Sequence, residues 1–105
     1  MNPLKGVITP KQLADFCERW KIIEIIAYEP IRDAATSDNQ LEFMLTLRLG
    51  VPWNLLDHVA MEYELTDLTG CPVNIVDKRH VETSEYWNGL REQVFKTAQV
   101  MYVGG

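Results

Sequence analysis

The chain has 105 residues, of which 47% are hydrophobic and 24% are charged, values typical of one globular domain. Its net charge of −5 argues against a general nucleic-acid-binding protein, because such proteins usually carry a basic face. The start of the chain lacks the apolar region of a signal peptide, and no apolar run reaches the length of a membrane span. We therefore expect a cytoplasmic protein with no nucleic-acid partner and no membrane partner.

The basic cluster and the two cysteines of the chain receive a structural interpretation only. Lys78, Arg79 and His80 form a basic cluster, which we interpret as a solvated loop. Cys17 falls on an apolar helix face and is expected to be a small buried hydrophobe, whereas Cys71 lies at a loop-to-strand junction. A disulfide between the two cysteines stays open at this stage.

The first helix is predicted to follow an N-terminal tail of residues 1–8. Thr9 and Gln12 have the spacing of a capping box, so we expect a helix that begins there and ends near Lys21. Its apolar stripe consists of Leu13, Phe16, Cys17 and Trp20.

Two strands are predicted next. Residues 22–28 form an almost continuous apolar run, typical of a strand covered on both faces, in which Glu24 marks an edge or a strand end. Residues 40–49 alternate strictly, which is a strong strand signal. One face of this second strand would carry Leu41, Phe43, Leu45, Leu47 and Leu49, and the other face Gln40, Glu42, Met44, Thr46 and Arg48. Pro30 breaks regular structure between the strands, and residues 31–36 are predicted to form a helical turn.

The second half of the chain predicts two further helices and two further strands. A helix is expected from Asn54 to about residue 69, with Gly70 as its C-terminal cap. Its buried stripe would be Leu55, Leu56, Val59, Ala60 and Tyr63, with Asp57, Glu62, Glu64 and Asp67 mostly on the other side. There follow a strand over 71–76, a loop over 77–82, a helix from Thr83 or Ser84 to about residue 98, and a strand over 100–103. The apolar stripe of that last helix would be Trp87, Leu90, Val94, Phe95 and Ala98.

These elements predict one α/β (α+β) domain over residues 9–103, with residues 104–105 as a C-terminal tail. The economical packing is a mixed sheet of about four strands against three main helices.

Several residues on these elements have a characteristic spacing. Tyr28-Glu29 ends the first strand, ten residues follow, and Gln40-Leu41-Glu42 opens the second strand. Asn74 lies on the third strand, and Arg32 lies in the predicted helical turn. In element order, length and spacing, residues 9–103 resemble the minimal nucleotidyltransferase family, small prokaryotic members of the DNA polymerase β-like superfamily. That family has Gly-Ser at the position of Tyr28-Glu29, Asp-x-Asp at that of Gln40-Leu41-Glu42, and a third Asp at that of Asn74.

The resemblance implies nucleotide transfer by two divalent cations that carboxylates hold. Gln40, Glu42 and Asn74 offer one carboxylate where the family has three, and a neutral amide supplies no formal charge. The Tyr28 ring fills space that glycine leaves open, and Glu29 would repel phosphate. We therefore interpret the catalytic positions as vestigial. The vestigial nucleotide-binding positions are Tyr28, Glu29 and Arg32.

Three functions remain open. The first is a pseudoenzyme without cofactors that binds a protein partner. Because active relatives often pair with helical HEPN-type proteins, the resemblance implies an antitoxin-like member of such a pair. The second is an active nucleotidyltransferase that uses Mg²⁺ and an NTP, with Glu42 as metal ligand together with Asp38 or an acid from a partner. The third is a nucleotide-sensing domain without turnover. We favour the first.

Other candidates have simpler interpretations. Asp38 lies in a predicted turn, and His58 is expected to be a surface or hydrogen-bonded helical histidine. Trp20 and Trp87 belong to helical stripes and are predicted to be core. Trp53 follows Pro52 outside any stripe, and we predict it to be an exposed aromatic anchor at a protein contact. The apolar strand 100–103 makes a homo-oligomer a further expectation.

Overall fold

The computed structural model describes residues 8–28 and 41–104 of the chain. Its helices are α1 (Pro10–Trp20), α2 (Leu55–Thr69), α3 (Lys78–Thr83) and α4 (Arg91–Lys96), with a 3₁₀ turn, η1 (Glu85–Trp87), between the last two. Its strands are β1 (Ile22–Ala27), β2 (Leu41–Leu47), β3 (Val73–Asp77) and β4 (Gln99–Val103). The predicted helical turn over 31–36 lies outside the described residues.

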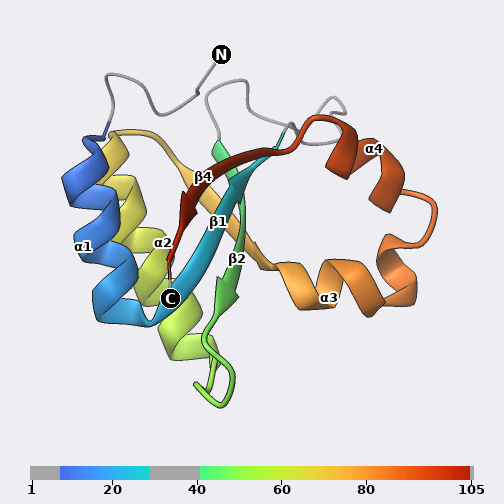
Figure 1. The fold of residues 1–105 in the computed structure, drawn as a ribbon, viewed down its shortest axis with the longest axis horizontal. Coiled ribbons are helices and arrows are strands. Elements are labelled where there is room, and N and C mark those ends of the chain that lie inside the picture. The colour runs from blue at the N-terminus through green and yellow to red at the C-terminus, as the bar shows by residue number, and fades with distance from the viewer. Residues whose placement is uncertain (1–7, 29–40, 105) are drawn as a thin grey trace.

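The strands form one mixed sheet in the order β3-β2-β1-β4, which confirms the predicted architecture. The strand β1 pairs antiparallel with both β2 and β4, whereas β2 pairs parallel with β3. Figure 1 shows α1 and α2 on one side of the sheet and α3 and α4 on the other. The sheet is therefore the middle layer of three, and each of its faces packs against a pair of helices.

Two clusters of buried side chains fill the spaces between these layers. The first core cluster joins the sheet to α1 and α2, and its largest fully buried members include Phe16, Ile25, Phe43, Met61 and Leu65. The second core cluster joins the sheet to α3 and α4, and it consists of Ile26, Tyr28, Met44, Val81 and Val94. Because both clusters contain residues of β1 and β2, the two central strands are covered on both faces.

The ends of α1 and α2 form as their local sequences predict. Thr9 and Gln12 make both hydrogen bonds of a capping box, and Lys21 ends α1 in the left-handed conformation. Asn54 caps α2 in the same way, and Gly70 ends it with a φ of 72°. Glycine reaches this conformation without the steric cost that a Cβ brings. Packing begins one residue before the predicted cap, because Ile8 is buried in the first core cluster.

The alternation in β2 is confirmed up to Leu47, but the prediction for Leu49 was wrong. Leu49 lies in a turn after the strand and is 82% exposed. The opposite face also differs from a simple polar side, since Met44 is fully buried in the second core cluster. The interpretation of Glu24 as an edge or strand-end marker was wrong as well. The strand β1 is central, and Glu24 lies where its register with β2 shifts.

The buried stripe predicted for α2 was wrong. Met61, Leu65 and Thr69 face the sheet, whereas Leu55, Leu56, Val59 and Tyr63 are exposed. Apolar residues follow both sides of this helix, so periodicity alone did not decide which side faces inward.

Two predictions for the segment after β3 were also wrong, namely a loop over 77–82 and a long third helix. Asp77 accepts a hydrogen bond from the Arg79 N–H and caps α3, so a helix begins immediately after β3. Gly89, with a φ of 88°, lies in the turn before α4 and interrupts the expected continuous helix. The basic cluster is consequently no solvated loop. Lys78 pairs with Glu24 at 2.8 Å, and Arg79 donates to the Leu47 carbonyl at 2.8 Å.

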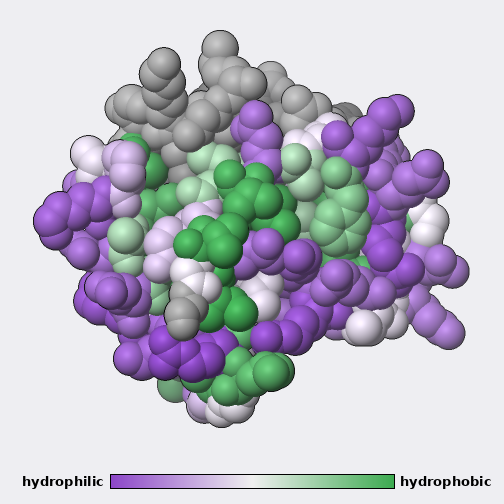
Figure 2. All heavy atoms as spheres, in the orientation of Figure 1, coloured by the Kyte–Doolittle hydropathy of each residue, from purple (hydrophilic) through white to green (hydrophobic). Residues whose placement is uncertain are grey.

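The remaining sequence predictions concern burial and the last strand. Cys17 is buried and both cysteines are free thiols. Trp20 packs against the first core cluster and Trp87 against the second. The predicted final strand forms as β4 at one edge of the sheet. Figure 2 shows hydrophobic residues gathered near the centre of the view, where Figure 1 places β4. None of the helices in residues 8–28 and 41–104 is long and apolar enough to cross a membrane.

Candidate functional site

The sheet brings together three of the predicted site residues, Tyr28, Glu42 and Asn74. Tyr28 follows β1, and its N–H donates to the Glu42 carbonyl at 3.2 Å. Glu42 and Asn74 are direct partners in the parallel register of β2 and β3. The Asn74 side-chain amide donates to a Glu42 carboxylate oxygen, Nδ2 to Oε2, at 3.0 Å. The spacing argument therefore identified positions that lie side by side in the fold.

Burial makes this site electrostatically sensitive. Glu42 is only 8% exposed, and Tyr28 belongs to the second core cluster. Burial raises the pKa of the Tyr28 phenol well above its ordinary value, and the charge of Glu42 and a hydrogen bond to its carboxylate raise it further. The phenol is thus held protonated as a donor. Glu42 accepts hydrogen bonds from two neutral groups, which is how a buried carboxylate avoids an unsatisfied charge.

The other predicted positions of this site cannot be placed beside these three. Glu29, Arg32, Asp38 and Gln40 lie outside the described residues. Within the described part of the chain, no group of three or more His, Cys, Asp or Glu side chains is arranged to hold a metal ion.

The described donors fit a pair of divalent cations poorly. Magnesium prefers anionic oxygens in near-octahedral geometry, and Glu42 is the single carboxylate among the three residues. Asn74 directs its N–H group at that carboxylate, so its amide oxygen points away from the position where a shared cation would need it. The Tyr28 ring lies beside the Glu42 carboxylate, on the same face of the sheet. Among the described residues, these three share a hydrogen-bond network centred on the Glu42 carboxylate.

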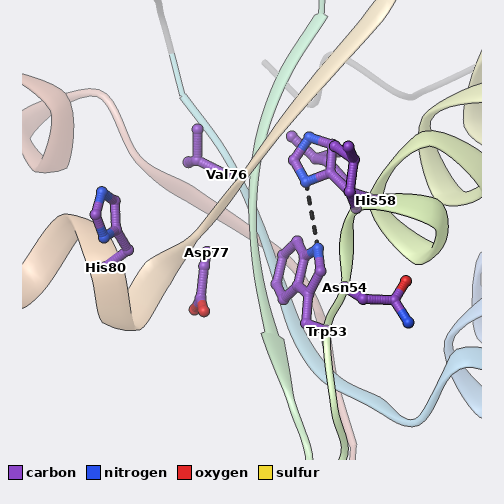
Figure 3. A pocket seen from close by; sticks show the side chains of 8 residues that line it. Trp53, Asn54, His58, Val76, Asp77 and His80 are labelled. Atoms are coloured by element: carbon purple, nitrogen blue, oxygen red, sulfur yellow. Dashed lines mark hydrogen bonds between the residues drawn. The ribbon is translucent and has the colours of Figure 1, made fainter.

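A second candidate site lies at the outer edge of β3. It is an open pocket of about 530 Å³, bordered by the residues before and at the start of α2 and by the start of α3. Its walls are Trp53, Asn54, Leu55, His58, Ile75, Val76, Asp77 and His80. Figure 3 shows Trp53 and His58 on one side of β3 and His80 on the other.

Trp53 is less exposed than predicted. It is half-buried, packs against the first core cluster and donates from its indole nitrogen to His58 Nδ1 at 3.2 Å. The Trp53 and His58 rings are 5.8 Å apart and tilted by 32°. The predicted role of Trp53 as an anchor for a protein partner stays a prediction.

His58 and Glu62 complete a chain of contacts that sequence reasoning identified only in part. The Nε2 atom of His58 lies 3.4 Å from Glu62 Oε2, and the same oxygen accepts the Ile75 N–H at 2.9 Å. His58 is therefore the hydrogen-bonded helical histidine that was expected. Glu62 was not singled out, although its spacing of four residues from His58 places both on one side of a helix.

Comparison with known proteins supports the assignment of the fold. No protein-family model and no curated protein matches the chain. A solved structure that carries the provisional description of a minimal nucleotidyltransferase matches with a TM-score of 0.56 and 26% sequence identity, covering 86% of each chain. Together with the spacing of Tyr28, Glu42 and Asn74, this match shows that the chain has the fold of a minimal nucleotidyltransferase.

Proposed function

We propose that this chain is a non-catalytic nucleotidyltransferase-like protein that acts by binding a protein partner. By the family resemblance, the partner is a helical HEPN-type protein, and the chain has the antitoxin-like role in the pair. The proposed protein needs neither Mg²⁺ nor a nucleotide for this role. The fold supports the resemblance, while the identity of the partner rests on analogy alone.

The observation that carries the proposal is the environment of Glu42. Its carboxylate is buried beside a protonated phenol and an amide N–H, so it has neutral partners of the kind that stabilise an anion within a core. To bind a cation there, Glu42 would have to exchange these hydrogen bonds for metal coordination, and Asn74 would have to turn its amide. Phosphoryl transfer depends on preorganised positive charge, and the described members of this network, Tyr28, Glu42 and Asn74, carry none.

The proposal is tested by measuring nucleotide binding and transfer on the intact chain. We expect calorimetry to detect no Mg²⁺-dependent ATP binding, and we expect no radiolabel to pass from labelled ATP to a co-purified protein. Glu42→Gln serves as the matched variant, because it keeps the shape of the side chain and removes its charge. Label transfer by the wild type that Glu42→Gln abolishes would refute the proposal, and Mg²⁺-dependent ATP binding without transfer would favour a sensing role instead.

A further inference from the structure

The outward side of α2 is an apolar surface that the rest of the described chain leaves uncovered. It consists of Leu55, Leu56, Val59 and Tyr63, which are between 41% and 80% exposed. Leu55, Val59 and Tyr63 are four residues apart, so they form one row along the helix, with Leu56 beside it. Single exposed apolar residues are ordinary, but a continuous row of large ones marks an interaction surface. We name these four residues the α2 face.

The α2 face is separate from the side by which the helix joins the fold. Met61 and Leu65 are at most 1% exposed and already anchor α2 to the sheet in the first core cluster. A helix that is apolar on both sides is normally buried between two layers. One of those layers is the sheet of this chain, and none of the residues 8–28 and 41–104 supplies the other.

Charge decides what that second layer is. The helix α2 contains Asp57, Glu62, Glu64 and Asp67 and no Lys or Arg. Glu64 pairs with Arg19 of α1, but the other three lie within ion-pair distance of no Lys or Arg in the described residues. Asp67 continues the row of Leu55, Val59 and Tyr63 by one further turn. The helix α2 of a second copy has no Lys or Arg to pair with Asp67, so packing two copies through this helix brings no complementary charge.

We propose that the α2 face binds an amphipathic helix of a partner protein, one whose apolar side is flanked by Lys or Arg. Leu55, Leu56, Val59 and Tyr63 supply the apolar contact, and Asp67 supplies a complementary charge at its end. Such a helix lies on a preformed apolar row in the way that many helical ligands occupy grooves. The inference rests on the proposed function, because it names the surface and the chemistry of the partner in that protein-binding role.

The test uses a synthetic helix of leucine and lysine, with the leucines on one side, as the probe. We expect calorimetry at physiological salt to detect its binding to the intact chain, and no binding of the corresponding leucine–glutamate helix. The double variant Leu56→Ser, Tyr63→Ser should bind the probe at least about tenfold more weakly. Asp67→Asn should weaken binding less and reduce its dependence on salt.

The control variant places the same substitutions on a different apolar surface, as Val100→Ser with Val103→Ser on β4. It should bind the probe like the wild type, and circular dichroism should show that both double variants are folded. Equal binding by all variants would overturn the proposal, as would self-association of the wild type that Leu56→Ser removes. Neither result depends on nucleotide transfer, so failure here is distinguishable from failure of the proposed function.

Discussion

Asn74 is the residue whose identity most directly sets the chemistry of the described site. It sits opposite Glu42 in the parallel register and neutralises no charge, but it donates the hydrogen bond that a third carboxylate could not. If an acid replaced the Asn74 amide, the hydrogen-bond donor to Glu42 would become a second acceptor. In the structure, these two adjacent positions form a polar contact.

Asn74→Asp should create a pair of facing carboxylates that binds Mg²⁺. Two facing carboxylates repel each other, so we expect the variant to lose about 1–3 kcal/mol of unfolding free energy near neutral pH. Millimolar Mg²⁺ should recover part of that loss, because a cation between two carboxylates removes the repulsion. Thermal unfolding with and without Mg²⁺ measures both effects. Asn74→Ser is the matched control, and a magnesium response of equal size in that variant would contradict the explanation.

Cys17 should be chemically silent in the folded protein. Burial raises the pKa of its thiol from 9.0 to about 12, and the reactive form of cysteine is the thiolate. We expect iodoacetamide to modify the partly exposed Cys71 first and to modify Cys17 about 100-fold more slowly, through opening of the fold. Mass spectrometry of peptides from the treated protein measures both rates. Equal rates in the native state would mean that α1 is not packed as described.

The same shift has a consequence at high pH. Because the folded pKa of Cys17 lies above its unfolded value, the folded state binds more protons between these two values. The contribution of the neutral thiol to stability is complete below pH 9.0 and is lost progressively as the pH rises toward about 12. Cys17→Ala should remove this part of the alkaline loss of stability.

At the scale of elements, the contrast between α2 and β4 shows two kinds of unprotected surface. The helix presents side chains, whereas the edge strand β4 also presents backbone N–H and C=O groups. Val100 and Val103 are 58% and 70% exposed, and residues 99–103 contain no charged residue or proline. Proteins commonly place a charged residue or a proline on an edge strand to prevent pairing, and β4 has neither.

We expect two copies of the chain to pair through β4, as the apolar final strand predicted. Val100→Lys should shift the chain toward the monomer, because a lysine on an edge strand opposes pairing with a second strand. The substituted side chain is largely exposed, so folding stability should change by less than about 0.5 kcal/mol. Sedimentation equilibrium over a range of concentrations measures the effect. Val59→Lys on α2 is the control, and the idea is excluded if the wild type is monomeric or if both variants dissociate alike.

At the scale of the whole molecule, the sequence predicted what local chemistry determines. The helix ends at Thr9 and Gly70 follow from hydrogen bonds and backbone preferences within a few residues, and both formed as expected. The mixed sheet of about four strands was predicted from the elements in chain order, whereas the strand order β3-β2-β1-β4 was not predicted. The family spacing also predicted that Glu42 and Asn74 lie close together, and the parallel register of β2 and β3 makes them partners.

What could not be predicted depends on contacts between distant elements. Which side of α2 faces the sheet is decided by how Met61 and Leu65 fit the first core cluster, and both sides of that helix are apolar. In the sequence, the charged start of α3 resembled a solvated loop. The ion pair of Lys78 with Glu24 joins residues far apart in the chain, so no local pattern indicates it. The inward position of Tyr28 likewise follows from the pairing of β1 with β2, which no local pattern specifies.

The contact of Glu62 with the Ile75 N–H also limits how the protein can assemble. That carboxylate occupies a backbone donor on the outer side of β3, at the opposite end of the sheet from β4. In the dimer expected through β4, β3 is the remaining edge strand of each copy, and this contact removes one of its backbone donors. We therefore expect Glu62 to oppose the addition of a further strand at that edge of the dimer.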